Sequence, residues 1–131
     1  MDNYPAELRY TREHEWARVE GPRARVGITH YAQAELGDVV FVELPKVGTR
    51  VTQLQPFGVV ESVKAVSDLF APLTGEVVEV NPELPQRPEW VNQDPYGKGW
   101  MIVIALSTSK ELEALMTAEQ YQAYLQQKGG H

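Results

Sequence analysis

The sequence contains no cysteine, and this absence excludes disulfide bonds, thiol catalysis and cysteine-based metal sites. Any redox chemistry would therefore have to come from a group attached to the chain. Basic residues are also outnumbered, because 12 Lys and Arg stand against 18 Asp and Glu and give a formal net charge of -6. A phosphate backbone or an anionic membrane surface demands a basic face. We therefore expect neither nucleic acid nor membrane as a partner.

Long apolar runs are missing as well. The longest run of aliphatic residues and methionine is Met101–Leu106, far shorter than the roughly 20 residues of a membrane-spanning helix. The first residues, MDNYPAELRY, contain no basic region followed by an apolar segment, so we expect no signal peptide and a cytoplasmic location. With 131 residues, 43% of them hydrophobic and 23% charged, the chain is expected to form one globular domain over residues 1–131.

No residue pattern typical of a catalytic centre or a metal site is present. His14, His30 and His131 lack the spacing of a zinc site with carboxylates, and none belongs to an HExxH motif, so we expect structural or surface roles for them. The segment Gly97–Gly99 lacks the spacing of a phosphate-binding loop, and a nucleophile elbow is missing. The sequence therefore predicts no metal, no catalytic residues and no enzyme activity.

Many short β-like segments, separated by turn residues, predict a mainly β fold of the sandwich or barrel type. The expected strands cover residues 8–10, 14–19, 24–28, 39–44, 50–54, 59–63, 65–70, 76–80 and 101–106. Gly37–Val42 (GDVVFV) and Gly75–Val80 (GEVVEV) also resemble each other at an offset of 38 residues (75 − 37). This echo favours two related halves packed face to face.

One short helix is predicted within the first half of the chain. Thr29 is placed to cap a helix over His30–Leu36, and Gly37 is placed to end it. By contrast, residues 82–99 contain four prolines, which cannot donate to a sheet ladder. We therefore expect a loop that runs over the surface in this region.

After residue 106 the apolar period becomes helical. Thr108 and Glu111 have the spacing of a capping box, and Thr117 and Gln120 repeat it. One or two helices, over about residues 108–128, are therefore expected to pack against the sheet.

Lys64 stands out at the reversal between two apolar segments, in GVVESVKAVSDLFAP at residues 58–72. Chain reversals normally carry Gly, Asn, Asp or Pro, whereas Val63 and Ala65 flank this lysine without an acidic neighbour. One interpretation is a solubilising lysine at a hairpin tip. The other is an amine presented to a modifying enzyme, which would give it a long neutral arm by acylation.

The stretch around Lys64 resembles the lipoyl-attachment segment of H proteins, the carrier subunits of the glycine cleavage system. The likeness extends to HEW at 14–16, VGIT at 26–29, YAQ at 31–33, LGDVVFVELPKVG at 36–48, TGEVVEVN at 74–81 and NQDPYGKGW at 92–100. These segments follow the order of the family and cover nearly the whole chain. One departure is Asn81–Pro88, which is richer in proline than this loop of the family.

The resemblance implies a lipoyl-domain-like barrel-sandwich hybrid of two sheets with approximate two-fold symmetry, short helices and a C-terminal helix. It also implies a lipoate covalently attached to Lys64, which would supply the sulfur atoms that the chain lacks. The implied partners are the PLP-dependent glycine decarboxylase, the aminomethyltransferase, dihydrolipoamide dehydrogenase and a lipoate ligase or lipoyl transferase. The carrier would shuttle the aminomethyl group of glycine from the decarboxylase to the transferase, and the dehydrogenase would reoxidise it.

Two carboxylates match acidic residues of the family. These are Glu15 in the His-Glu-Trp context and Asp68 in the Lys-x-x-x-Asp context. A loaded arm would carry a protonated amine, which carboxylates in a groove would attract and shelter from water. We therefore expect Glu15 and Asp68 to dock the loaded arm; the alternative is that both are ordinary surface carboxylates.

Other classes of protein stay open. A lipoyl domain of a 2-oxo acid dehydrogenase would carry Asp-Lys-Ala at the tip, where this chain has Val63, and would lack a segment like residues 94–100. A biotin carrier would carry methionine on both sides of the lysine. A lipoyl relay, which donates its group to other acceptors, or an unmodified interaction module is also compatible with the hairpin. Intact mass after expression with a lipoylating system identifies the unmodified module.

Overall fold

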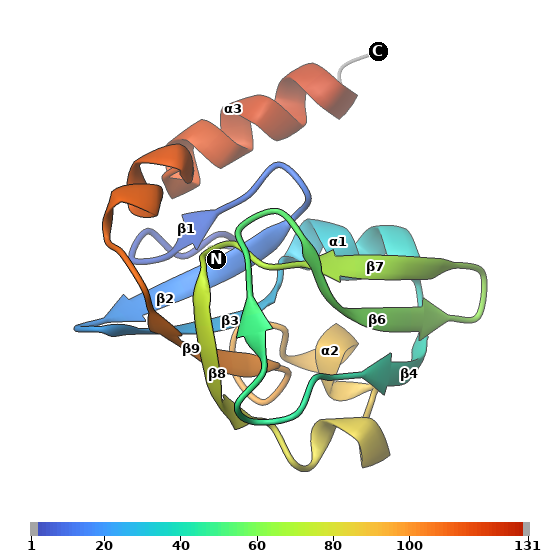
Figure 1. Cartoon of the computed structure of the whole chain (residues 1–131). Helices are drawn as coiled ribbons and strands as arrows, with labels where there is room; N and C mark the ends of the chain where they lie inside the picture. Colours follow the sequence, from blue (N-terminus) through green and yellow to red (C-terminus); the bar gives the residue numbers. More distant parts are fainter. Residues whose placement is uncertain (1–2, 130–131) are drawn as a thin grey trace.

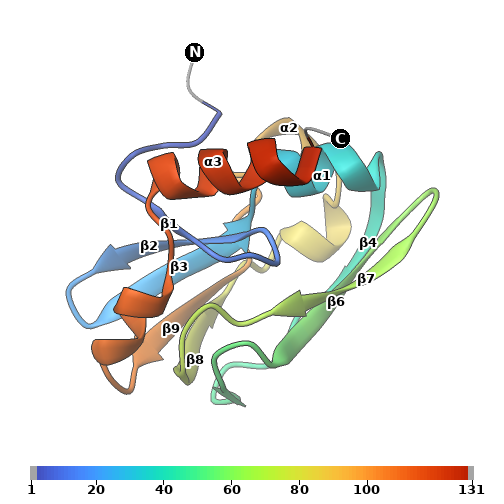
Figure 2. The ribbon, with the colours of Figure 1, turned by 90° about the horizontal axis from the view of Figure 1, so that it is seen from above.

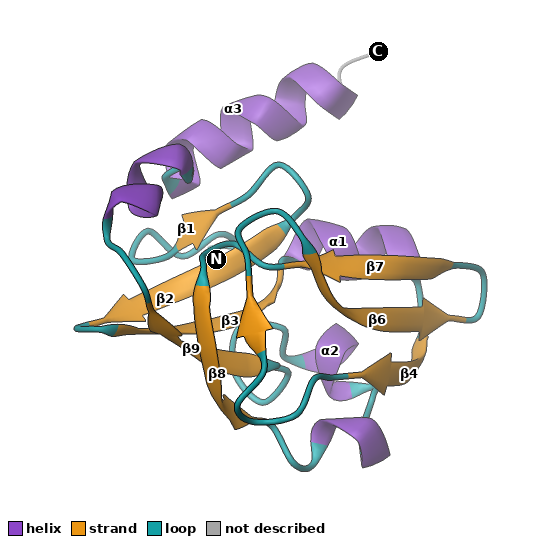
Figure 3. Cartoon of the chain, in the orientation of Figure 1, coloured by secondary structure: helices purple, strands orange, loops and turns teal. Residues whose placement is uncertain are grey.

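Two antiparallel β-sheets dominate the chain in the computed structural model, which describes residues 3–129 (Figures 1 and 3). The strands are β1 Arg9–Tyr10, β2 Glu15–Glu20, β3 Arg23–Ile28, β4 Val39–Glu43, β5 Arg50–Val51, β6 Pro56–Ser62, β7 Val66–Phe70, β8 Gly75–Val80 and β9 Ile102–Leu106. The larger sheet has the order β1-β2-β3-β9-β8-β5 and the smaller one β4-β6-β7. The expectation of a mainly β fold with two sheets is confirmed.

The helical elements are short, apart from the last one. They are α1 His30–Leu36, the 3-10 helix η1 Leu84–Gln86, α2 Trp90–Gln93, the 3-10 helix η2 Lys110–Ala114 and α3 Ala118–Gly129. None of the helices within residues 3–129 is long and apolar enough to cross a membrane.

The main core lies between the two sheets, and both sheets contribute inward-facing aliphatic side chains to it. Val26 and Ile104 come from the larger sheet, and Val42, Val60 and Leu69 come from the smaller one. Each is at most 2% exposed. At roughly 1.5–3 kcal/mol for each buried aliphatic side chain, this layer holds the two sheets together.

The two similar sequence segments lie in different sheets. Gly37–Val42 leads into β4 of the smaller sheet, and Gly75–Val80 forms β8 of the larger sheet. At Gly75 an added Cβ would collide with the carbonyl oxygen of Ala105, so the close pairing of β8 with β9 requires glycine. The chain therefore contributes one copy of the pattern to each layer.

The helix α1 has the bounds that the sequence predicts. Thr29 Oγ1 accepts a hydrogen bond from the backbone N–H of Ala32 at 3.2 Å, which satisfies one of the free donors at the helix start. Gly37 ends the helix with a φ of 78°, a conformation that glycine adopts without strain.

The expectation of a simple surface loop over residues 82–99 is wrong. The segment contains η1 and α2, and it buries Leu84 and Val91 in the main core. Asn81 joins the start of this segment to its end. Its side-chain amide donates to the carbonyls of Lys98 and Trp100, both at 2.8 Å. The prolines exclude a strand here, but they do not exclude short helical turns that bury apolar side chains.

The C-terminal segment contains two helical elements, and α3 lies across β1 (Figures 1 and 2). The capping box of α3 is present: Thr117 N–H donates to Gln120 Oε1 at 3.0 Å, and Gln120 N–H donates to Thr117 Oγ1 at 3.2 Å. The prediction of a second capping box, at Thr108 and Glu111, is wrong. The Glu111 carboxylate instead accepts from the N–H and the hydroxyl of Thr74, at 2.7 and 2.6 Å.

Candidate functional site

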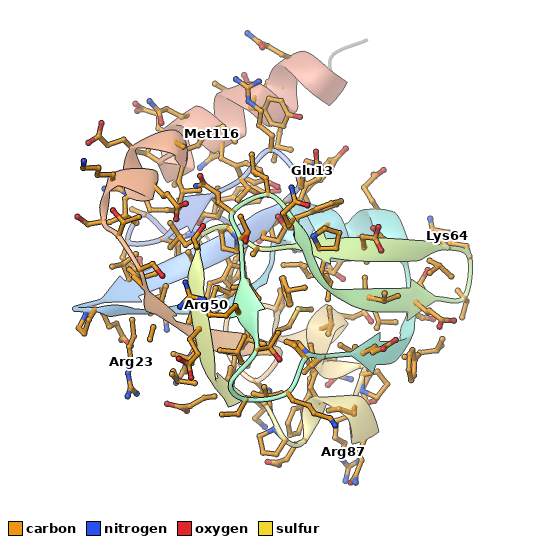
Figure 4. The ribbon with its side chains drawn as sticks, in the orientation of Figure 1. Glu13, Arg23, Arg50, Lys64, Arg87 and Met116 are labelled. Atoms are coloured by element: carbon orange, nitrogen blue, oxygen red, sulfur yellow. The ribbon has the colours of Figure 1, made fainter. Side chains whose placement is uncertain are left out.

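Lys64 lies at the tip of the hairpin formed by β6 and β7, which extends away from the rest of the fold (Figures 1 and 4). Its side chain is exposed. Two apolar neighbours are also exposed, Val63 to 69% and Val66 to 68%. The structure therefore places the lysine and two valines together at a tip where solvent and other proteins have access.

Ser62 builds the turn at this tip. Its Oγ accepts hydrogen bonds from the N–H groups of Lys64 and Ala65, at 3.3 and 3.1 Å, and its own N–H donates to the Ala65 carbonyl at 2.8 Å. A serine oxygen that accepts from the following N–H groups stabilises a turn without glycine or proline. In addition, Val63 N–H donates to the Asp38 carbonyl at 3.0 Å, so the tip is tied to the segment after α1.

The Lys64 side chain folds back over the end of α1. Its Cε lies 3.4 Å from the position that a Cβ would occupy on Gly37. The negative end of a helix dipole favours an ammonium group near this position. The ion pairs Arg18–Glu7 and Arg23–Glu79 do not involve Lys64, and the sequence places no acidic residue directly beside it.

A groove of about 350 Å³ begins beside Lys64, and this volume lies at the lower end of the range of small-molecule sites. Three segments supply most of its lining: Ala65–Leu69 of the hairpin, residues 31, 32, 35 and 36 of α1, and Glu13–Glu15 before and at the start of β2. Ile28 and Val60 complete it. The groove thus connects the turn that bears Lys64 with both carboxylates singled out in the sequence, Glu15 and Asp68.

The groove is acidic. Four carboxyl groups line it, and its described lining contains neither lysine nor arginine; the four are Glu13, Glu15, Glu35 and Asp68. In Figure 4 the labelled arginines, Arg23, Arg50 and Arg87, lie away from the hairpin tip. Two of the four, Glu13 and Glu35, were not predicted from the sequence. Glu35 follows Tyr31 by four residues, and that spacing places both on one face of α1.

Glu15 differs from the other three because it is only 1% exposed. Its Oε1 accepts from the Thr11 hydroxyl at 2.7 Å, and its Oε2 accepts from the Phe70 N–H at 3.1 Å. Burial raises the pKa of Glu15 to about 8, against the lowering effect of these two hydrogen bonds. The interpretation of Glu15 as a surface carboxylate is therefore wrong: it forms the floor of the groove and ties β7 to the segment before β2. Asp68 is exposed.

The histidines occupy structural positions where the structure describes them. His14 lines the groove with a left-handed backbone, φ 75°; its Nδ1 lies 2.8 Å from Tyr121 Oη, and its ring centroid lies 4.6 Å from that of Tyr31. His30 begins α1, and His131 lies outside the described residues. Within residues 3–129 there is no group of three or more His, Asp or Glu side chains that could hold a metal ion.

Comparisons with known proteins agree over nearly the whole chain. Residues 8–128 match the family described as "Glycine cleavage H-protein". The glycine cleavage system H protein of Geobacillus kaustophilus (strain HTA426) is 61% identical over 123 residues, and that of Bacillus subtilis (strain 168) is 59% identical over 123 residues. Each alignment covers 94% of this chain and 97% of the relative. A crystal structure of a glycine cleavage system H protein from Mycobacterium marinum has a TM-score of 0.84 at 40% identity, over 97% of this chain and 99% of that chain.

Proposed function

The chain belongs to the glycine cleavage H-protein family, and on this premise we propose that Lys64 is the lipoyl-bearing residue of a carrier that shuttles the aminomethyl group of glycine. One observation carries the proposal: an exposed lysine at a hairpin tip stands at the entrance of an acidic groove. Exposure alone does not single it out, since Lys46, Lys98 and Lys110 are exposed too. None of those three has a chain neighbour that lines the groove, whereas Lys64 directly precedes Ala65, which does.

The residues around Lys64 fit a lipoyl group. Its amine is accessible for the amide bond, and the exposed Val63 and Val66 offer apolar contact to an aliphatic arm. Inside the groove, Leu36 and Leu69 add apolar walls. When attached, lipoate supplies the disulfide that accepts an aminomethyl group and two electrons from glycine. Every other contribution comes from side chains that bind, orient and shield.

The groove is suited to a cationic cargo. Asp68, Glu13 and Glu35 are exposed side chains that line it and attract an ammonium group. Glu15 sits on the floor, where burial keeps its carboxyl proton bound at neutral pH. An ammonium ion beside Glu15 favours the ionised carboxylate, so Glu15 can release its proton and pair with the cargo. Enclosure of the amine between α1 and the hairpin also limits access of water.

The partners follow from this role. The hairpin tip is presented to glycine decarboxylase, then to the aminomethyltransferase, and then to dihydrolipoamide dehydrogenase. A lipoate ligase or lipoyl transferase would modify it beforehand. In this proposal residues 1–131 act as one carrier domain, and the chain itself catalyses no step.

Peptide mapping after expression with a lipoate ligase tests the attachment site. The chain has five lysines, Lys46, Lys64, Lys98, Lys110 and Lys128. We expect lipoyl mass on the Lys64 peptide alone and none on a Lys64→Arg chain. Lipoyl mass on another lysine, or an unmodified parent chain, would contradict the proposal.

The docking role is tested on the lipoylated chain after loading by glycine decarboxylase. Asp68→Asn, and the pair Glu15→Gln with Asp68→Asn, should be lipoylated like the parent but should lose the loaded group to hydrolysis faster. Asp38→Asn is the matched control, because Asp38 is an exposed carboxylate near the tip and outside the groove lining. Equal lifetimes in the parent and the groove variants would end the docking assignment.

A further inference from the structure

Tyr121 connects α3 to the groove, although the described lining of the groove includes no residue of α3. The side chain is completely buried, and its ring stacks on Tyr10 with the centroids 4.8 Å apart and the planes 7° apart. Its Oη lies 2.8 Å from His14 Nδ1 and 2.8 Å from Thr29 Oγ1. One hydroxyl therefore contacts two segments that are separate in the sequence.

These two segments carry two parts of the groove. His14 directly precedes Glu15, which forms the floor, while Thr29 caps α1, which forms one wall. The Thr29 N–H also donates to the His14 carbonyl at 3.0 Å. His14 has a φ of 75°, a conformation that is unfavourable for a residue other than glycine and persists only when its surroundings hold it. Tyr121 is one of the groups that hold it.

We propose that Tyr121 is a positioning residue of this groove, whose hydroxyl fixes the turn that ends at His14, directly before Glu15, against the start of α1. In this arrangement α3 sets the shape of the groove without touching the arm. The inference rests on the proposed function, since it takes the groove to be the place where the loaded arm docks. Burial raises the pKa of the Tyr121 phenol above its usual range. The phenol thus keeps its proton, and it can donate to one partner while it accepts from the other.

Tyr10 provides a matched control. It shares the aromatic stack with Tyr121, and its hydroxyl donates to the Pro5 carbonyl at 2.7 Å. Neither Tyr10 nor Pro5 lines the groove. Tyr10→Phe therefore removes a hydroxyl from the same buried cluster without releasing either wall of the groove.

Amide hydrogen exchange on the unmodified protein tests the positioning role without any arm. In Tyr121→Phe, the amides of Thr29 and Glu15 should exchange about three- to tenfold faster relative to those of β9, because each of the two segments loses one hydrogen bond. In Tyr10→Phe these amides should exchange as in the parent. Unchanged exchange in Tyr121→Phe, or equal acceleration in both variants, would overturn the proposal. If Tyr121→Phe does not fold, His14→Asn replaces it, because asparagine tolerates a positive φ and lacks the imidazole that reaches Tyr121.

The lifetime of the loaded arm gives the second test. Tyr121→Phe should be lipoylated at the parent's rate, and its loaded arm should hydrolyse about three- to tenfold faster. In a Glu15→Gln background the same substitution should have no further effect, because the group that it positions is already altered. A full effect in that background would indicate a general structural role and would contradict the proposal. A parent chain that glycine decarboxylase cannot load would refute the proposed function instead, and the exchange experiment would still test Tyr121.

Discussion

Replacing Glu15 with glutamine should remove a pH dependence of stability that the parent chain carries. The pKa of Glu15 is raised from 4.5 to about 8 in the folded chain, chiefly by burial. Because the folded state binds this proton more tightly than the unfolded state, the free energy of unfolding falls as the pH rises through this interval. The contribution of Glu15 is fully present below about pH 4.5 and is lost by about pH 8.

The size of the effect follows from the same interval. At about 1.4 kcal/mol per pH unit, a shift from 4.5 to about 8 corresponds to an upper bound of about 5 kcal/mol. Relaxation around a buried charge reduces such penalties, so we expect a measured change on the order of 2 to 5 kcal/mol. Glutamine has nearly the same shape, can accept from the Phe70 N–H, and can donate to the Thr11 hydroxyl oxygen. The variant should therefore fold and keep both contacts.

Urea unfolding of the unmodified parent and of Glu15→Gln, at pH values from 4.5 to 8.5, provides the measurement. Every other side chain is the same in both chains, so the difference between the two unfolding free energies reports the substitution of Glu15. We expect the parent to lose stability relative to the variant as the pH rises. A difference that stays constant over the whole range would refute the reasoning about the buried carboxyl.

Three further predictions concern the tip, the last helix and the sheet. Ser62→Ala removes the oxygen that organises the turn, so kcat/KM for lipoylation of Lys64 should fall about two- to tenfold. Ser109→Ala, at an exposed serine outside the hairpin and the groove lining, should leave it unchanged, and equal rates in all three chains would contradict the role of Ser62. Gln120→Ala breaks half of the capping box and should lower the free energy of unfolding by about 1 kcal/mol in urea, with the exposed Gln122→Ala as control. Gly75→Ala places a methyl group against the Ala105 carbonyl and should cost more than about 2 kcal/mol; a thermal midpoint equal to that of the parent would show that β8 and β9 separate easily.

Short sequence patterns were sufficient to predict the ends of helices that depend only on neighbouring residues. The Thr29 cap and Gly37 bound α1, and the reciprocal pair Thr117 and Gln120 starts α3, because each signal acts within one helical turn. The lysine between two strand-like segments likewise indicated the hairpin tip. Such short-range patterns do not depend on the rest of the fold.

Features that depend on distant partners could not be predicted in the same way. Glu111 has capping-box spacing, but its carboxylate accepts hydrogen bonds from Thr74 instead of capping the helix. The burial of Glu15 arises only when β7 packs beside it, and the contact between Tyr121 and His14 joins residues 107 positions apart. The serine that organises the tip was also missed, since its oxygen replaces the glycine or proline that turn rules expect.

Reconstitution with glycine decarboxylase is the measurement that tests most directly whether Lys64 carries cargo for separate enzymes. Labelled glycine is incubated with the decarboxylase and with either the lipoylated parent chain or Lys64→Arg treated with the same ligase. Release of labelled carbon dioxide should rise strongly with the parent and stay at background with the variant. Equal release with both chains, or no stimulation by the lipoylated parent, would contradict the role of Lys64.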